Sequence, residues 1–137
     1  MTLDVVNWLA VVVCVVVSMI SGFLWYHPKT FFPAWWKGIN KMDTPAPTTG
    51  GPPSTWVLTV LAAVVQAVVM SVVLSAMGAG NVSAGVTAGV LLWFGFVAPT
   101  SLANKLFAGA GMKVWAIEAG NHLLNFVLFG AILGFWR

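Results

Sequence analysis

The sequence predicts an all-α integral membrane protein whose four transmembrane helices form an antiparallel bundle. Hydrophobic residues make up 60% of the 137 residues and charged residues only 7%, whereas a soluble domain is about one quarter charged. Four apolar segments are each long enough to cross a hydrocarbon core of about 30 Å. Helices are expected because only helices and closed barrels satisfy their backbone hydrogen bonds in lipid, and four strands cannot close a barrel.

The expected spans cover residues 5–26, 56–77, 84–107 and 114–136 of a single membrane domain, residues 1–137. The first is predicted to be a retained span, because an acidic residue and no basic one precedes it, unlike a cleaved signal peptide. Residues 28–55 form a long, proline-rich loop. The connections GAGNVS and AGAGMK are short, so the second, third and fourth spans are expected to pack consecutively as antiparallel neighbours.

Aromatic side chains are concentrated where the first span ends, in the segment GFLWYHPKTFFPAWW. Indole and phenol rings favour the membrane–water interface, because one edge is apolar and the other is polar. A short interfacial helix is expected near Thr30 to Lys41. The expected interface anchors of the whole chain are Trp25, Tyr26, Trp35, Trp36, Trp56 and Trp115.

The basic residues predict the orientation of the chain. Three of the six lie in the first loop, namely Lys29, Lys37 and Lys41, while Lys105 and Lys113 flank the third loop and Arg137 ends the sequence. Basic loops are retained on the inner side of a membrane. We therefore expect loops one and three inside and both termini outside, on the periplasmic, extracellular or lumenal side.

Small residues four positions apart recur in the spans. Such pairs place small side chains on one helix face and permit close backbone approach, which is the main attraction between helices in lipid. The expected packing residues are Ser18, Gly22, Gly85, Gly89, Gly130 and Gly134. In the third span, Pro99 lacks the N–H group that would bond to the carbonyl of Gly95, and it should kink the helix. The kink either fits the bundle or marks a binding site of the kind found in transporters.

A polar stripe runs along the fourth span in the segment EAGNHLLN. Glu118, Asn121, His122 and Asn125 fall within an arc of about 100° on one helix face. Gln66 is expected at similar depth in the second span, hydrogen-bonded to Asn125 or His122. Lys105 is expected to pair with Glu118 across the third loop. Because polar groups are costly in lipid, the stripe should face protein or water.

Two roles remain open for this stripe: a hydrogen-bonded zipper that fixes helix register, and a proton relay or cation site. No metal site is expected, since one His and one Glu supply too few ligands, and Cys14 stands alone. No cofactor is expected, and a basic patch for nucleic acid is absent from the sequence. Enzymatic activity is not expected, because the sequence offers no nucleophile–base–carboxylate set.

Three sequence blocks together carry a family resemblance. They are GFLWYHPKTFFPAWW, LLWFGFVAPTSLANKLFAG and NHLLNFVLFGAILGFW. The chain resembles a small four-span membrane family catalogued as domain of unknown function 1761. The resemblance implies a helical membrane bundle and brings no reaction or substrate with it.

The expected function is therefore that of a non-catalytic integral membrane protein that acts through helix packing. Its partners would be the lipid bilayer and either further copies of itself or the other subunits of a larger membrane complex, with no nucleic acid. The alternative is a small oligomeric channel, or a transporter coupled to protons or cations, that uses the polar stripe of the fourth span.

Overall fold

The computed structural model describes residues 1–39 and 51–136 of the chain. Its elements are η1 (Leu3–Val5), α1 (Trp8–Trp25), α2 (Phe32–Ile39), α3 (Pro53–Ala76), α4 (Val82–Leu92), the π-helical turn η2 (Trp93–Val97), α5 (Ala98–Phe107) and α6 (Met112–Phe135). The helices α1, α3 and α6 and the continuous segment Val82–Phe107 are each long and apolar enough to cross a membrane. The four expected spans are thus present as helices, as in a multi-pass membrane protein.

The helix starts differ from the expected boundaries for local chemical reasons. The first long helix begins at Trp8 and not at residue 5, because the side chain of Asn7 caps it by accepting hydrogen bonds from the amides of Leu9 and Ala10. The second begins early, at Pro53. A proline is tolerated in the first turn, where its missing N–H group would have no helical partner.

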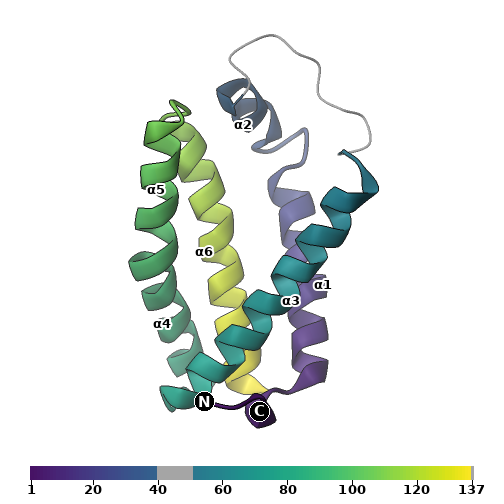
Figure 1. Cartoon of the computed structure of the whole chain (residues 1–137), viewed down its shortest axis with the longest axis vertical. Helices are drawn as coiled ribbons and strands as arrows, with labels where there is room; N and C mark the ends of the chain where they lie inside the picture. Colours follow the sequence, from purple (N-terminus) through teal and green to yellow (C-terminus); the bar gives the residue numbers. More distant parts are fainter. Residues whose placement is uncertain (40–50, 137) are drawn as a thin grey trace.

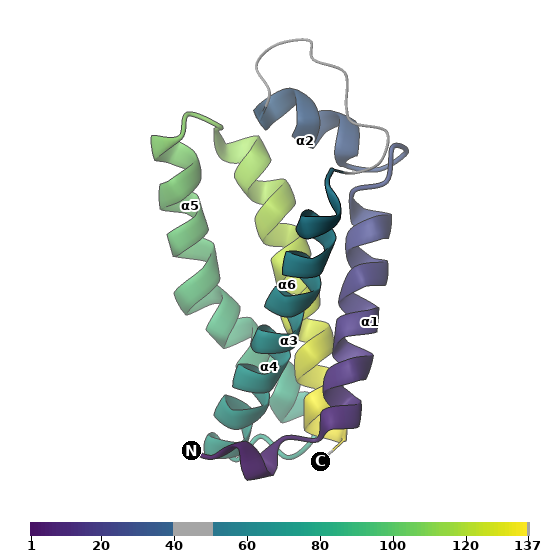
Figure 2. The ribbon, with the colours of Figure 1, turned by 45° about the vertical axis from the view of Figure 1, so that its right-hand side comes forward.

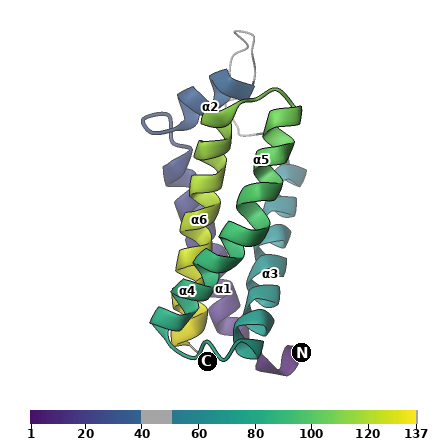
Figure 3. The same ribbon diagram turned by 90° about the vertical axis from the view of Figure 1, so that its left-hand side faces the viewer.

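The long helices alternate in direction, and α6 lies at the centre. In Figure 1 the chain rises through α1, descends through α3, rises through α4 and α5 and descends through α6. Both termini lie at one end, and α2 lies at the other end beside the turn between α5 and α6. Every other helix packs against α6, and α4 has the most extensive contact with it. Figure 3 shows α4 and α5 running alongside α6.

The position of α3 corrects the expectation of consecutive packing. This helix packs against α1 and α6 and makes few contacts with α4 or α5. Figure 1 shows it crossing obliquely in front of α6. The connection between α3 and α4 is short. Within it Gly78 adopts a positive φ of 69°, a conformation that glycine tolerates. The glycine face of α4 packs on α6 instead of on α3.

The third span is interrupted where the sequence predicts a kink. Residues Trp93–Val97 form a π-helical turn, and Pro99 lies in the first turn of α5. Because Pro99 has no N–H group to bond to the carbonyl of Gly95, the regular series of α-helical hydrogen bonds is interrupted just before α5. Figure 2 shows the change of direction between α4 and α5. As a result α5 leans away from α3.

The apolar core occupies the half of the bundle that contains the termini. Its largest fully buried side chains include Cys14 on α1, Leu74 on α3 and Phe129 on α6. Met70 and Leu133 join the same cluster. Cys14 packs in this core as a small apolar side chain. The polar side chains of α6 therefore lie mainly in the other half, toward α2.

Candidate functional site

An ion pair joins the α2-side ends of α5 and α6. Lys105 Nζ lies 2.9 Å from Glu118 Oε2, and the two side chains are 29% and 19% exposed. Lys105 occupies the last turn of α5 and Glu118 the second turn of α6, so the short connection between these helices brings the two charges together. The expected pair is present, and it neutralises the carboxylate within the bundle.

Asn125 is bonded to a helix other than the expected one. Its Oδ1 accepts a hydrogen bond of 2.6 Å from Ser21 Oγ on α1. Among the described residues Gln66 has no hydrogen-bond partner, so the expected bond from Gln66 to Asn125 or His122 is wrong. The reason is the direction of the side chain around the axis of α3: Gln66 lines a groove between α3 and η2.

The polar stripe of α6 is divided between two directions. Asn121 lies one turn from both Ile117 and Asn125, which bond to Trp25 and Ser21 of α1, so it belongs to the face of α6 that packs on α1. It is only 7% exposed, and its Nδ2 has no hydrogen-bond partner among the described residues. Glu118, by contrast, bonds to α5, and His122 is exposed.

Three tryptophan N–H groups bind helices together. Trp25 Nε1 donates to the carbonyl oxygen of Ile117 at 2.9 Å, and Trp93 Nε1 donates to that of Ala119 at 2.9 Å. Trp115 Nε1 donates to Ala98 O at 3.1 Å and is 3.2 Å from Ser101 Oγ. Trp25 and Trp115 are two of the expected interface anchors. Their indole N–H groups hydrogen-bond within the bundle, so these side chains also join neighbouring helices.

The other expected anchors differ in their surroundings. Trp56 is 51% exposed at the start of α3. Trp35 has a buried Nε1 without a hydrogen-bond partner in the part of the chain that is described, and its ring packs edge-on against Tyr26 at 5.2 Å. Trp36 stacks on Phe32 at 5.8 Å. Trp56 is thus the indole of this set that is placed for contact with lipid.

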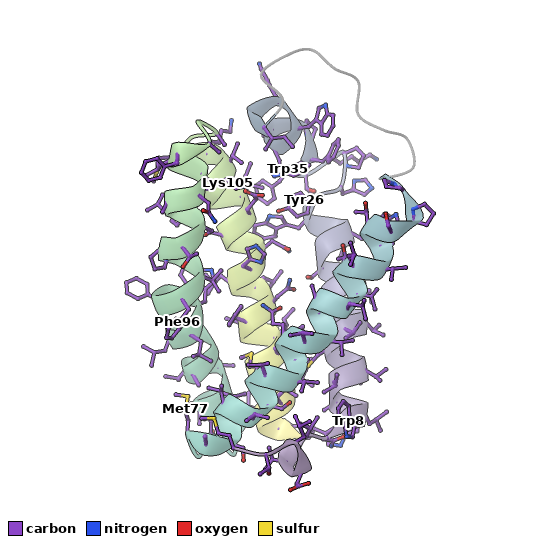
Figure 4. All side chains as sticks on the ribbon, viewed as in Figure 1. Trp8, Tyr26, Trp35, Met77, Phe96 and Lys105 are labelled. Atoms are coloured by element: carbon purple, nitrogen blue, oxygen red, sulfur yellow. The ribbon has the colours of Figure 1, made fainter. Side chains whose placement is uncertain are left out.

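Tyr26 and α2 lie at the same end of the bundle as the ion pair (Figure 4). Figure 4 shows Lys105, Trp35 and Tyr26 at the same end, with Trp8 and Met77 at the opposite end. Tyr26 follows the last residue of α1 and lies outside that spanning helix. Burial and, secondarily, the negative charge of Glu118 raise the pKa of Tyr26 to about 12. The raised pKa strengthens the preference for the protonated form that a phenol already has at neutral pH.

Four glycines bring the backbones of α4 and α6 into direct contact. A Cβ atom on Gly85 would overlap the carbonyl oxygen of Gly130, and one on Gly130 would overlap that of Gly85. Gly89 faces the carbonyl of Phe126 in the same way, and Gly134 faces that of Asn81. These contacts explain why α4 and α6 form the closest helix pair in the fold.

The packing residues expected in α1 do not form such a contact. A Cβ atom on Gly22 would meet no neighbouring atom within 4 Å. Ser18 is buried, and its hydroxyl bonds to Val15 O of its own helix at 2.8 Å. The polar residue of α1 that does reach α6 is Ser21, which lies three positions after Ser18. The sequence signal for Ser21 is a second hydroxyl residue near the end of the apolar first span.

A large apolar groove lies between α3 and η2. Its volume is about 640 Å³, its floor includes Phe126 of α6, and Gln66 is the one amide on its walls.

The described residues contain no group of three His, Cys, Asp or Glu side chains that could hold a metal ion. Chemically, the site combines one neutralised charge pair with unpaired amide groups, which suits hydrogen bonding between helices.

Comparison with known proteins identifies the family. No curated protein and no solved structure matches the chain. The model of a family described as a protein of unknown function, DUF1761, matches residues 9–134. This range includes almost all of the four spans together with the polar residues of α6, so the chain belongs to the DUF1761 family.

Proposed function

We propose that this chain is a non-catalytic integral membrane protein that acts through helix packing, either as a homo-oligomer or as an accessory subunit of a larger membrane complex. The observation that carries the proposal is the position of Gln66. Its amide lines the groove between α3 and η2, and no described residue forms a hydrogen bond with it. A partner that fills the groove would complete the site.

The depth of Gln66 makes this lack of a partner significant. It follows Trp56 by about 15 Å along α3, near the middle of a hydrocarbon core of about 30 Å. No water is available at that depth, and a polar group without a hydrogen bond in an apolar medium costs roughly 2–7 kcal/mol. Exposed leucine or valine on the same helix is compatible with lipid, but this amide favours contact with another protein.

His122 supports the same conclusion from α6. Its side chain is exposed, although it lies about 10 Å inward from Trp115 along the helix. The chain thus presents polar groups at membrane depth on two helices, α3 and α6. Intramembrane polar residues normally face a bundle interior or a water-filled cavity. Association with another chain would supply such an interior.

The proposed orientation places both termini outside. In the described part of the chain, Lys29 precedes α2 and Lys37 lies on it. Lys105 and Lys113 lie on either side of the turn between α5 and α6. Both segments lie at one end of the molecule, opposite the termini (Figure 1). Lys41 and Arg137 lie outside the described residues. The positive-inside rule favours the lysine-bearing end as the inner one.

The channel or transporter alternative has weaker support. The polar residues of α6 end at Asn125, and the following turns bury Phe126, Phe129 and Leu133 in the apolar core. A path for protons or cations through one chain would have to cross that core. Proton flux into proteoliposomes should therefore equal that of empty liposomes, and flux that is reduced by Glu118→Gln and His122→Ala would support the alternative instead.

The experiment that tests the proposed function is a mass measurement on the intact membrane assembly. The full chain of 14.6 kDa would be extracted directly from its native membrane into lipid nanodiscs and analysed by native mass spectrometry. We expect a species containing more than one polypeptide. A strictly monomeric species without any partner, obtained at expression levels close to natural, would contradict the proposal.

A further inference from the structure

The groove beside Gln66 has one wall whose pattern is typical of a helix–helix contact. Ala62, Gln66, Val69 and Val73 of α3 line it, and Val69 is 55% exposed. Their spacings of four, three and four residues place them in one row along α3, with Gln66 within the row. Such a row is the seam by which two helices interlock their side chains.

The opposite wall and the floor of the groove come from η2 and α6. Phe96 of η2 is 73% exposed and stands across the groove from α3, while Phe126 of α6 forms part of the floor and is almost fully buried. Since α5 leans away from α3, the groove remains open at the side. A helix in this position would contact α3 and η2 simultaneously.

The identity of the occupant follows from the chemistry of a carboxamide. An amide side chain carries both hydrogen-bond donors and an acceptor, so two glutamines can satisfy each other. Copies inserted in the same orientation are related by a two-fold axis along the membrane normal, and each residue meets its own counterpart at equal depth. A second copy would therefore bring its own Gln66 to the same depth, where the two amides would be able to bond.

We propose that the groove receives α3 of a second copy of this chain, with the two α3 helices parallel and the two Gln66 side chains hydrogen-bonded at the two-fold axis. This inference rests on the proposed function and names the partner. Each α3 would lie between α3 and η2 of the other copy. Glutamine across a helix interface is a recognised source of association in lipid.

Other occupants fit the groove less well. A lipid acyl chain would fill the apolar walls but would leave the Gln66 amide without a hydrogen bond, which is the cost that the contact must remove. The close-contact glycines do not offer a competing surface, because Gly85, Gly89, Gly130 and Gly134 are already covered by backbone within the chain. The α3 face, which carries the Gln66 amide, remains open to a second copy.

Disulfide trapping tests this geometry in the full-length protein. Cys14 is the single cysteine of the sequence, so Cys14→Ala provides a background for Gln66→Cys, studied in membranes under mild oxidation. We expect a covalent dimer, because side chains at a two-fold axis approach within the distance that a disulfide requires, about 4.4–6.8 Å between Cα atoms. The matched control is Val16→Cys, which is 51% exposed on α1 and should remain monomeric.

A second measurement avoids the introduced thiol. Fluorescence energy transfer between labelled copies in liposomes would give the dimer dissociation constant for the wild type, Gln66→Leu and Gln66→Asn. Loss of the amide pair should weaken association about 3- to 30-fold. The asparagine variant retains a carboxamide and should lie closer to the wild type than the leucine variant does.

The outcomes separate this inference from the proposed function. Cross-linking at residue 66 and not at residue 16, with weaker association of Gln66→Leu, supports both. A multimeric native mass with no cross-link at residue 66, or a cross-link there to a different protein, overturns the α3 contact and leaves the proposed function standing. Equal dissociation constants for the wild type and Gln66→Leu also overturn the contact. A partner-free monomer overturns both.

Discussion

Ser21 on α1 donates a hydrogen bond to Asn125 on α6, with 2.6 Å between Ser21 Oγ and Asn125 Oδ1. The contact lies between the ion-paired end of the bundle and its apolar core. Ser21 itself is only 8% exposed, so water has little access to its hydroxyl. The bond therefore fixes the axial register of α1 on α6, which four turns of apolar side chains alone specify poorly.

The Ser21–Asn125 bond should appear as an energetic coupling. A double-mutant cycle with Ser21→Ala and Asn125→Ala should give a coupling energy of about 0.5–1.7 kcal/mol, the range found for hydrogen bonds between membrane helices. Equilibrium unfolding in mixed micelles supplies the free energies. Ser18→Ala is the control, because Ser18 bonds to its own helix and should show no coupling to Asn125. Equal couplings for the two serines would contradict the assigned contact.

Removal of one member of the ion pair should destabilise the protein more than removal of both. Lys105→Met leaves the Glu118 carboxylate unpaired, with an expected loss of roughly 1–3 kcal/mol, between the values for exposed and fully buried pairs. Adding Glu118→Gln should restore part of the loss, since no charge then remains. The measurement is the free energy of unfolding of the two single variants and the double variant. Additive losses would show that the two groups act independently.

A methyl group at the contact between α4 and α6 should separate the two helices. In Gly130→Ala the new Cβ overlaps the carbonyl of Gly85, and because backbone cannot move aside locally we expect a loss of several kcal/mol or failure to fold. Gly22→Ala is the matched control, since its Cβ meets nothing within 4 Å. That variant should be neutral or slightly more stable, by up to about 1 kcal/mol. Thermal unfolding followed by circular dichroism distinguishes the two.

The N–H group of the Trp93 indole should by itself contribute measurably to the free energy of unfolding. Trp93→Phe keeps an aromatic ring but loses the hydrogen bond to Ala119 O, and we expect a decrease in the free energy of unfolding of about 0.5–1.5 kcal/mol. The same exchange at Trp56, which is 51% exposed, should change stability by less than half of that amount. Unfolding curves of the two variants in the same lipid provide the comparison, and similar losses would argue against a specific role for Trp93.

The sequence predicts well those features that depend on composition and on neighbouring segments. Four helices follow from apolar length, and the pair Lys105–Glu118 follows because a short connection holds these residues near one another. The close contacts at Gly85 and Gly130 also lie on the faces that small-residue spacing indicates. These features need no knowledge of how distant helices are rotated.

Other features depend on rotation and crossing angle, which hydrophobic periodicity does not specify when a helix is apolar all round. The spacing from Trp56 gives the depth of Gln66 along the helix but not the direction of its side chain, and the expected bond to Asn125 or His122 is therefore wrong. Ser21 was missed for the same reason. Residue type indicates an interface position for Trp25 and Trp115, but it does not indicate that carbonyl groups of neighbouring helices accept their N–H hydrogen bonds.

The π-helical turn at Trp93–Val97 divides the third span into halves with unlike attachments. The α4 half packs on α6 through direct backbone contacts at glycines. The α5 half contacts α6 mainly through side chains, among them Lys105 and the indole of Trp115. If this span bends, α5 should therefore move relative to α6 more readily than α4 does. The π-helical turn would be the hinge, and the glycine contacts would hold α4 in place on α6.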